Sequence, residues 1–130
     1  MNILVDSDVV IDFLKGEKKA VAFFEKTIFK KNIFISVISW AEIIYGFRKI
    51  KAINKEKLFE DFLEENEIKI IPIDKNVAEK YLKIKIILEK KNIPLADFDL
   101  LIAATALFYN LSLATRNRKH FKRVKDLVLV

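Results

Sequence analysis

Short apolar runs alternate along this chain with longer segments in which apolar residues recur every three or four positions. A short run is typical of a buried strand, and the longer spacing is typical of a helix with one buried face. The strand pattern occurs at residues 2–5, 33–36, 68–71, 111–115 and 127–130. Each of the first three runs is followed by at least one segment with helical spacing.

Capping residues and breakers place the helices between these strands. Ser7 or Asp8 can cap the first helix, and Gly16 can end it. Asp74 is positioned to cap a long helix through residue 88. The other predicted helices cover residues 18–30, a segment that starts at Ser36 or Ser39 and carries Glu42, residues 55–65, and a segment after Pro94 that carries Asp99.

The alternation of strands and helices predicts an α/β fold with a central parallel sheet of about five strands and helices on both faces. The 130 residues, of which 52% are hydrophobic, are expected to form a single domain over residues 1–130. In such sheets, ligands bind at the carboxyl ends of strands where the strand order reverses. Asp6 stands at the end of the first strand and Thr115 at the end of the fourth. If these two strands are neighbours at the reversal of strand order, the acids converge at that point.

Three acidic residues stand among apolar neighbours, where an unpaired charge is costly. Asp6 follows the first strand, Glu42 lies in a predicted helix, and Asp99 opens a helix rich in alanine. Each has a simpler explanation: Asp6 as a helix cap, Glu42 as an exposed helix residue, and Asp99 as a first-turn acid favoured by the helix dipole. Gly46, one turn after Glu42, would let another backbone approach.

Other polar residues near these acids remain open. Asp8 is undecided, Asp12 is interpreted as part of a solvated face, and Asp97 is interpreted as a helix cap. Asn117 is either a helix cap, a neutral ligand at a metal site, or both. His120 is expected to be a packing or surface residue.

The charge balance indicates nucleic acid as a partner, because an acidic cluster lies in a chain of net charge +6. Carboxylate oxygens suit Mg²⁺ or Mn²⁺, whereas the absence of cysteine and the single histidine argue against a zinc site. A basic run follows the fourth strand at Arg116, Arg118, Lys119, Lys122, Arg123 and Lys125. Such a run is usually a solvated face, but here it could bind phosphates at the mouth of the site.

The location of the protein is expected to be the cytoplasm. The first residues carry two aspartates and no basic lead, so they do not resemble a signal peptide. The longest apolar region, residues 100–114, is interrupted by polar residues and is shorter than the ~18–20 residues that span a membrane. We therefore expect a soluble protein with no membrane contact.

Four motifs in this order resemble the PIN-domain family, and in particular its VapC-type toxins. The motifs are ILVDSD at residues 3–8, ISVISWAE at 35–42 with Gly46, PLADFDLLIAATA at 94–106, and LATRN at 113–117 with Phe121. The resemblance covers the whole chain. It implies a three-layer PIN-like fold and an endoribonuclease that depends on Mg²⁺ or Mn²⁺ and serves as the toxin of a type II toxin–antitoxin pair.

The same resemblance assigns roles to residues at the site. Asp6, Glu42 and Asp99 match the family's catalytic and metal-binding acids, and Asn117 stands where the family often has a fourth acid. The missing charge favours a single ion with Asp6 and Asp99 as direct ligands and Glu42 acting through a water. Ser7 matches a small hydroxyl position of the family.

The partners implied by this resemblance are RNA, a cognate antitoxin and a second copy of the chain in a homodimer. Thr115 matches the second hydroxyl position, and Arg116, Arg118 and Lys119 begin the basic run that would bind flanking phosphates. An apolar groove among the early helices would receive the antitoxin.

Three alternatives remain. Residues 5–9 resemble the aspartyl-nucleophile motif of haloacid-dehalogenase-type phosphatases, in which Asp6 would be phosphorylated and Asp8 would act as acid and base. Asp8→Asn should abolish a phosphatase but only weaken a nuclease. A module that binds RNA or a partner without cutting is permitted by Asn117. A role in RNA processing rather than toxicity would use the same site.

Overall fold

A four-stranded parallel sheet forms the centre of the computed structural model, which describes residues 2–28 and 32–130. The strand order is β3-β2-β1-β4, so β1 is an inner strand that pairs with β2 on one side and with β4 on the other. The strands are β1 (Asn2–Val5), β2 (Asn32–Ser36), β3 (Lys69–Ile71) and β4 (Ser112–Ala114). Four of the predicted strands are therefore present, with β4 shorter at both ends than the pattern predicted.

The prediction of about five strands was wrong in its last member. Residues 127–130 form one isolated bridge, between Leu129 and Leu113, rather than a strand. The backbone of Leu113 holds this segment through two hydrogen bonds, one from its N–H to Val128 O and one from Val130 N–H to its carbonyl. β4 is only three residues long, so it offers few backbone groups for pairing, and Val128 is exposed to solvent. For these reasons the apolar segment 127–130 does not form a full strand beside β4.

Strand β1 shows why the sheet carries helices on both faces. Successive side chains of a strand point to opposite faces, and here Ile3 and Val5 pack into one hydrophobic cluster while Leu4 packs into the other. All three side chains are almost fully buried. A strand that is apolar at every position therefore requires cover on both sides, as the pattern predicted.

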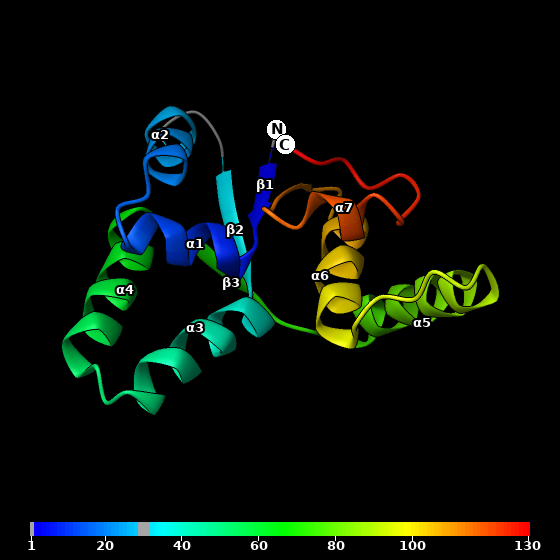
Figure 1. The fold of residues 1–130 in the computed structure, drawn as a ribbon, viewed down its shortest axis with the longest axis horizontal. Helices are drawn as coiled ribbons and strands as arrows, with labels where there is room; N and C mark the ends of the chain where they lie inside the picture. Colours follow the sequence, from blue (N-terminus) through cyan, green and yellow to red (C-terminus); the bar gives the residue numbers. More distant parts are fainter. Residues whose placement is uncertain (1, 29–31) are drawn as a thin grey trace.

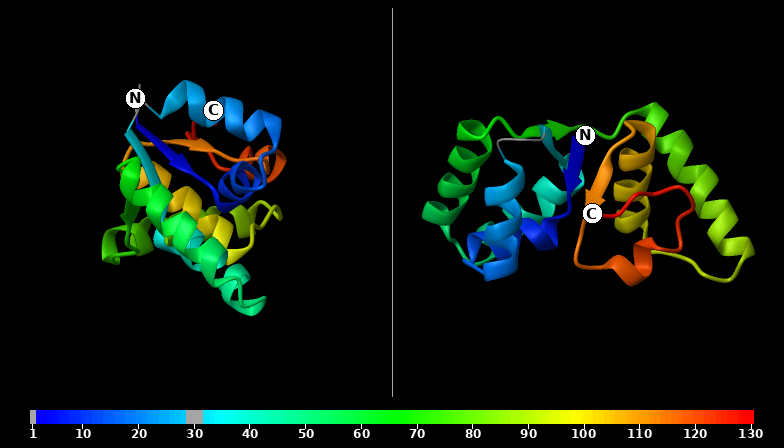
Figure 2. Two further views of the ribbon diagram at one scale, coloured as in Figure 1. Left: turned by 90° about the vertical axis from the view of Figure 1, so that its left-hand side faces the viewer. Right: turned by 90° about the horizontal axis from the view of Figure 1, so that it is seen from above.

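The helices are divided between the two faces of the sheet (Figures 1 and 2). One group precedes β3 along the chain and surrounds the cluster that contains Ile3. The second group follows β3 and packs on the cluster that contains Leu4. The first group is α1 (Ser7–Leu14), α2 (Lys18–Thr27), α3 (Val37–Lys49) and α4 (Ile53–Glu65), and the second is α5 (Lys75–Lys90), α6 (Asp97–Phe108) and α7 (Arg118–Phe121).

All the predicted helices are present, although the helix predicted for residues 18–30 extends to Thr27 with Ile28 as its C-cap, and residues 29 and 30 lie outside the described part of the chain. Ser36, one of two candidates, caps α3, and Asp74 caps α5 as predicted. The cap of α1 is Asp6 rather than Ser7 or Asp8. Within the described ranges, no helix is both long and apolar enough to cross a membrane.

The two leucines of α5 test how much the second helical group contributes to stability. Leu88 is 2% exposed and belongs to the core between α5 and α6, whereas Leu82 is 48% exposed. We expect Leu88→Ala to lower the free energy of unfolding by about 2–5 kcal/mol, because the truncation leaves a cavity. Leu82→Ala is the matched control and should cost less than about 1 kcal/mol. Urea denaturation of both variants measures the difference, and equal losses would contradict this packing.

Candidate active site

The carboxyl ends of β1 and β4 lie side by side, at the point where the strand order reverses. Val5 is in register with Ala114, and the N–H of Asp6 donates to the carbonyl of Ala114 at 2.9 Å. The next residues along each chain segment are therefore Asp6 and Thr115, which meet across a sequence separation of 109 residues. This is the convergence that the strand pattern predicted.

Asp6 is the most buried carboxylate of the site, with 7% of the residue exposed. One oxygen accepts from the N–H of Ser7 at 2.8 Å, and the other accepts from Thr115 Oγ1 at 2.9 Å. Burial nevertheless raises the pKa of Asp6 to about 7, with further contributions from the negative charges of Asp8 and Asp99. Asp6 therefore caps α1 and also carries a carboxylate whose charge is only partly compensated. Its interpretation as a helix cap and its interpretation as a site residue are thus compatible.

Glu42 reaches the site from the second turn of α3. Ser7 Oγ donates to Glu42 Oε1 at 3.3 Å, which connects α3 to the start of α1. Although Glu42 is exposed as a residue, partial desolvation of its carboxylate raises its pKa, and the charges of Asp99 and Asp8 raise it further. The prediction that another backbone segment approaches Gly46 was wrong, because a Cβ atom added there would have no neighbouring atom within 4 Å.

Asp99 lies in the first turn of α6 and is half-buried. Desolvation raises its pKa, and the nearby His120 opposes that rise. Asp97, two residues earlier, belongs to a different cluster and does not cap the helix: its carboxylate accepts from Tyr81 Oη and from Lys85 Nζ, each at 2.8 Å. The rotation of α6 therefore assigns Asp99 to the acidic site and Asp97 to the contact with α5.

Asp8 also belongs to the acidic site, which the sequence had left undecided. Its Oδ2 accepts from the N–H of Arg116 at 3.1 Å. Its Oδ1 is buried and has no hydrogen-bond partner among the described residues. Burial raises the pKa of Asp8, and Asp8 in turn raises the pKa of both Asp6 and Glu42. The signal in the sequence was its place three residues after a strand end, in the first turn of a helix.

Two side chains of the basic run make contacts within the protein, which the sequence pattern did not indicate. Arg116 forms an ion pair with Asp12 at 3.0 Å, and the Asp12 side chain is only 15% exposed, so Asp12 is not part of a solvated face. Arg118 Nη1 donates to the carbonyl of Val130 at 3.1 Å, while Lys119 is exposed. The guanidinium of Arg116 is therefore held in a defined orientation beside the acids.

Asn117 and His120 form a pair at the edge of this site. Asn117 Nδ2 lies 2.8 Å from His120 Nδ1, so the ring nitrogen must act as the acceptor. Asn117 is the N-cap residue of α7 by position, but its side chain makes no capping hydrogen bond. Its N–H donates to Thr115 Oγ1 at 3.0 Å, which continues the hydrogen-bonded chain that starts at Asp6. His120 is exposed, as expected for a surface residue.

The chemistry of these donors fits a divalent cation. The charges of Asp8 and Asp99 raise the pKa of both Asp6 and Glu42, and one buried oxygen of Asp8 lacks a donor, so a cation would relieve both costs. Within the described parts of the chain, however, no three His, Cys, Asp or Glu side chains form a group that could hold a metal ion by themselves. The donor set therefore suits an ion such as Mg²⁺, which keeps several waters and takes one or two carboxylates together with substrate phosphate.

These features define an α/β protein with an acidic site where the strand order of a parallel sheet reverses. The family model for the PIN domain matches residues 3–127, and the chain belongs to that family. It is similar to ribonuclease VapC1 of Methanocaldococcus jannaschii, with 33% identity over 127 residues that cover 98% of this chain and 84% of that protein.

Two solved structures share the fold over nearly the whole chain. The first, VapBC2 from Rickettsia felis bound to a DNA fragment from its promoter, has a TM-score of 0.89 and 27% identity and covers 100% of this chain and 98% of that one. The second, a toxin–antitoxin complex from Klebsiella pneumoniae, has a TM-score of 0.79 and 28% identity, with coverage of 98% and 96%. The three-layer PIN-like fold predicted from the motifs is thereby confirmed.

The raised pKa of Asp6 predicts how stability depends on pH when divalent cations are removed. Between the ordinary value of 3.8 and the raised value of about 7, the folded protein holds the Asp6 proton more tightly than the unfolded chain does. The free energy of unfolding should therefore fall as the pH rises through this window. Asp6→Asn should flatten the decline, as measured by urea denaturation in EDTA. Leu82→Ala, which leaves every carboxylate in place, is the control, and an unchanged slope in Asp6→Asn would contradict the assignment.

Proposed function

We propose that this protein is an endoribonuclease that requires Mg²⁺ or Mn²⁺ and hydrolyses phosphodiester bonds of RNA. The observation that carries this proposal is the convergence of Asp6, Glu42 and Asp99, from β1, α3 and α6, on one edge of the sheet. The similarity to a protein named as a ribonuclease supports the same conclusion and disfavours the aspartyl phosphatase. The surplus of basic residues over the whole chain suits a polyanionic substrate.

Asp6 and Asp99 are the residues that would hold the ion directly. When bound, the ion lowers the pKa of a water and offsets negative charge on the phosphate. Thr115 keeps Asp6 in orientation through its 2.9 Å hydrogen bond. Neither Asp8 nor Asn117 is needed as a direct ligand, but each could complete the site through its free oxygen.

Glu42 is suited to receive the proton of the attacking water. Its carboxylate is accessible, it is held by Ser7 Oγ, and its raised pKa makes it a better base than an ordinary glutamate. The water oxygen forms the new bond to phosphorus while its proton moves to Glu42. The bond from phosphorus to the leaving ribose oxygen then breaks, and that oxygen takes up a proton from the solvent, to which Glu42 returns the proton that it received.

The basic residues after β4 would bind the phosphates that flank the scissile bond. Arg116 is fixed by Asp12, so its remaining N–H groups are presented with little loss of side-chain freedom. Arg118 and Lys119 are exposed at the start of α7. Contacts of this kind position RNA without reading its sequence.

A cognate antitoxin is the partner that the toxin–antitoxin structure suggests for this chain. An apolar groove of about 290 Å³ lies among α1, α3 and α4, as expected from the family resemblance. Ile11, Phe47 and Leu58 line it, and Leu58 is 65% exposed. Lysines at the rim, Lys15 and Lys55, favour a partner segment with apolar residues at helical spacing and acidic flanks.

A homodimer remains part of the proposal. Helix α5 leaves Leu82, Ile86 and Ile87 about half exposed, and a second copy could cover them. Sedimentation of the purified chain tests this part alone. A monomer at all concentrations would contradict it without affecting the nuclease.

Asp99→Asn tests the nuclease and its site together. We expect purified protein to cut RNA with Mg²⁺ or Mn²⁺ and not in EDTA, and the variant to be slower by at least about 100-fold because a metal ligand is lost. Asp97→Asn is the matched control, because Asp97 lies on the same turn of α6 but binds Tyr81 and Lys85 instead. Equal activity of wild type and Asp99→Asn would show that the acids are not catalytic. Metal-dependent RNA binding without any cutting would favour the non-catalytic module.

Leu58→Glu tests the antitoxin groove. We expect it to weaken co-purification with the antitoxin encoded beside this gene, because a charge would enter an apolar contact. Val128→Glu, an exposed apolar residue outside both the groove and the proposed dimer face, is the control and should leave that complex intact. If Leu58→Glu folds normally by circular dichroism and still binds the antitoxin, the antitoxin binds at another surface. The absence of any neighbouring antitoxin gene would favour the role in RNA processing.

A further inference from the structure

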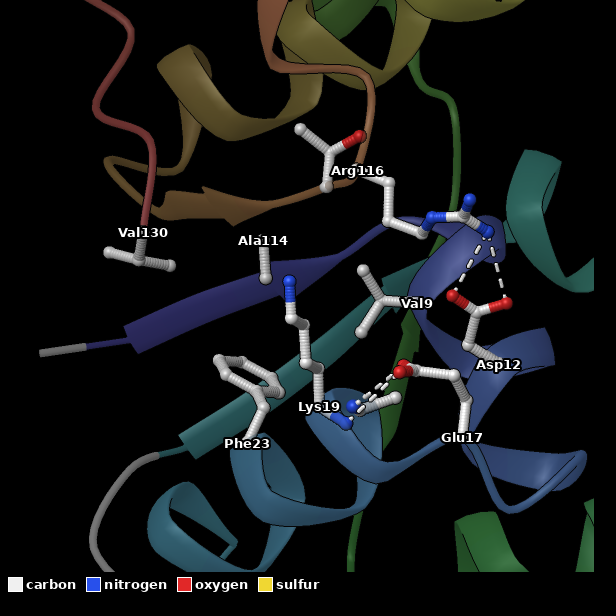
Figure 3. Close-up of a pocket in the computed structure, with 10 residues that line it drawn as sticks. Val9, Asp12, Glu17, Lys19, Phe23, Ala114, Arg116 and Val130 are labelled. Carbon is white, nitrogen blue, oxygen red and sulfur yellow. Dashed lines mark hydrogen bonds and ion pairs between the residues drawn. The ribbon is translucent and has the colours of Figure 1, made fainter.

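A second cavity, of about 630 Å³, opens beside the acidic site between α2 and the carboxyl end of β4 (Figure 3). It falls in the size range of small-molecule and cofactor pockets. It shares two residues with the acidic site, Thr115 and Arg116. Since Thr115 Oγ1 donates to Asp6, a ligand in this cavity would be one side chain away from the buried carboxylate.

The inner part of the cavity is apolar and includes one aromatic ring. Val9, Ala20 and Ala114 form part of its lining. Phe23 and Val130 line the end of the cavity that is further from Asp12. Phe23 is half-buried, and its contact with Phe24 is edge-on with ring centroids 5.4 Å apart. A ring fixed by such a contact is a platform on which a flat, unpaired base can stack.

The polar part of the lining suits the rest of a nucleotide. Lys19 extends from α2 across the cavity, and Arg116 is fixed at its edge by Asp12 (Figure 3). Arg116 uses only Nη1 in that ion pair, and the other N–H groups of its guanidinium have no partner among the described residues. Lys19 stands between Phe23 and Arg116 (Figure 3), so the two cations lie along one path from the aromatic ring toward the acidic site, where successive phosphates of a strand could bind.

The two acids of the cavity are compensated and do not exclude RNA. Asp12 is paired with Arg116, and Glu17 accepts from the N–H groups of Lys19 and Ala20 at 3.2 and 3.1 Å. Glu17 keeps further acceptor capacity that an amino group of a base can use.

We propose that this cavity binds one unpaired base of the RNA next to the scissile phosphate, with Phe23 stacked on the base and Lys19 and Arg116 on the flanking phosphates. This inference rests on the proposed ribonuclease function. It assigns to α2 and β4 the role of choosing which single-stranded nucleotide is presented to the acids. It also explains why a half-buried aromatic ring faces a cavity that is lined by basic residues.

The test uses unstructured oligoribonucleotides that carry a fluorescent label and differ at one position. Binding is measured by anisotropy in the Asp99→Asn background, so that it is separate from cleavage. Phe23→Ala should weaken binding by about 5- to 150-fold, as expected for the loss of one stacked base. Phe23→Tyr should restore the affinity. In the otherwise wild-type protein, Phe23→Ala should raise KM more than it lowers kcat and should reduce the preference among bases at one position next to the cut.

Matched controls separate a nucleotide site from a change in folding. Lys19→Gln should reduce the slope of log affinity against log salt by about one, whereas Lys18→Gln, the exposed neighbour, should not. Phe108→Ala removes a partly exposed aromatic ring on α6 and should leave RNA binding unchanged. Crosslinking with oligonucleotides that contain 5-bromouridine should label Phe23 or its neighbours in α2.

The outcomes also distinguish this inference from the proposed function. Cleavage by the wild type, together with an unchanged affinity, KM and base preference in Phe23→Ala and Lys19→Gln, would overturn the nucleotide site and leave the nuclease intact. RNA binding that depends on Phe23, without cleavage, would retain the site and overturn the nuclease. Absence of RNA binding by the wild type would overturn both. Loss of antitoxin binding in Phe23→Ala, with normal RNA binding, would assign the cavity to the protein partner instead.

Discussion

The burial of Asp6 at the carboxyl end of β1 is the constraint to which the rest of the site responds. β1 is paired on both sides, so the residue that ends it lies inside the protein rather than at an edge. Two hydrogen bonds compensate its charge only in part, and its pKa remains raised. The charges of Asp8 and Asp99 increase this cost, and they also raise the pKa of Glu42.

Such an arrangement stabilises the protein less than an apolar site would, which agrees with the chemical role that we propose for it. The acids lie at the carboxyl ends of the strands. Basic side chains that are held by contacts within the protein lie beside them. Arg116 joins the two regions: its N–H binds Asp8, and its guanidinium binds Asp12 at the second cavity. The ion pair therefore links the site for the reaction to the surface on which we place the RNA.

The success of the fold prediction, and its failures, have specific physical reasons. β1 is apolar at every buried position and could only be an inner strand, whereas residues 127–130 are apolar throughout but form a single bridge to the three-residue β4 and leave Val128 exposed. Helix caps were less predictable, because a cap depends on which residue has an extended backbone: Asp6 has it, and Ser7 is already helical. Gly46 was misleading because it lies open, with no approaching backbone.

The sequence by itself determined the four strands, the helices α1 to α6 and the family, and it singled out three acids as candidates, because hydrophobic period and motif order are local properties of the chain. Only the tertiary structure decided which acids share a site. The rotation of α6 separates Asp99 from Asp97, and the first turn of α1 brings in Asp8. It also decided that Asp12 holds Arg116 and that α2 faces β4 across a cavity. These contacts join residues about a hundred positions apart, whose pairing depends on strand order and helix orientation rather than on any local pattern.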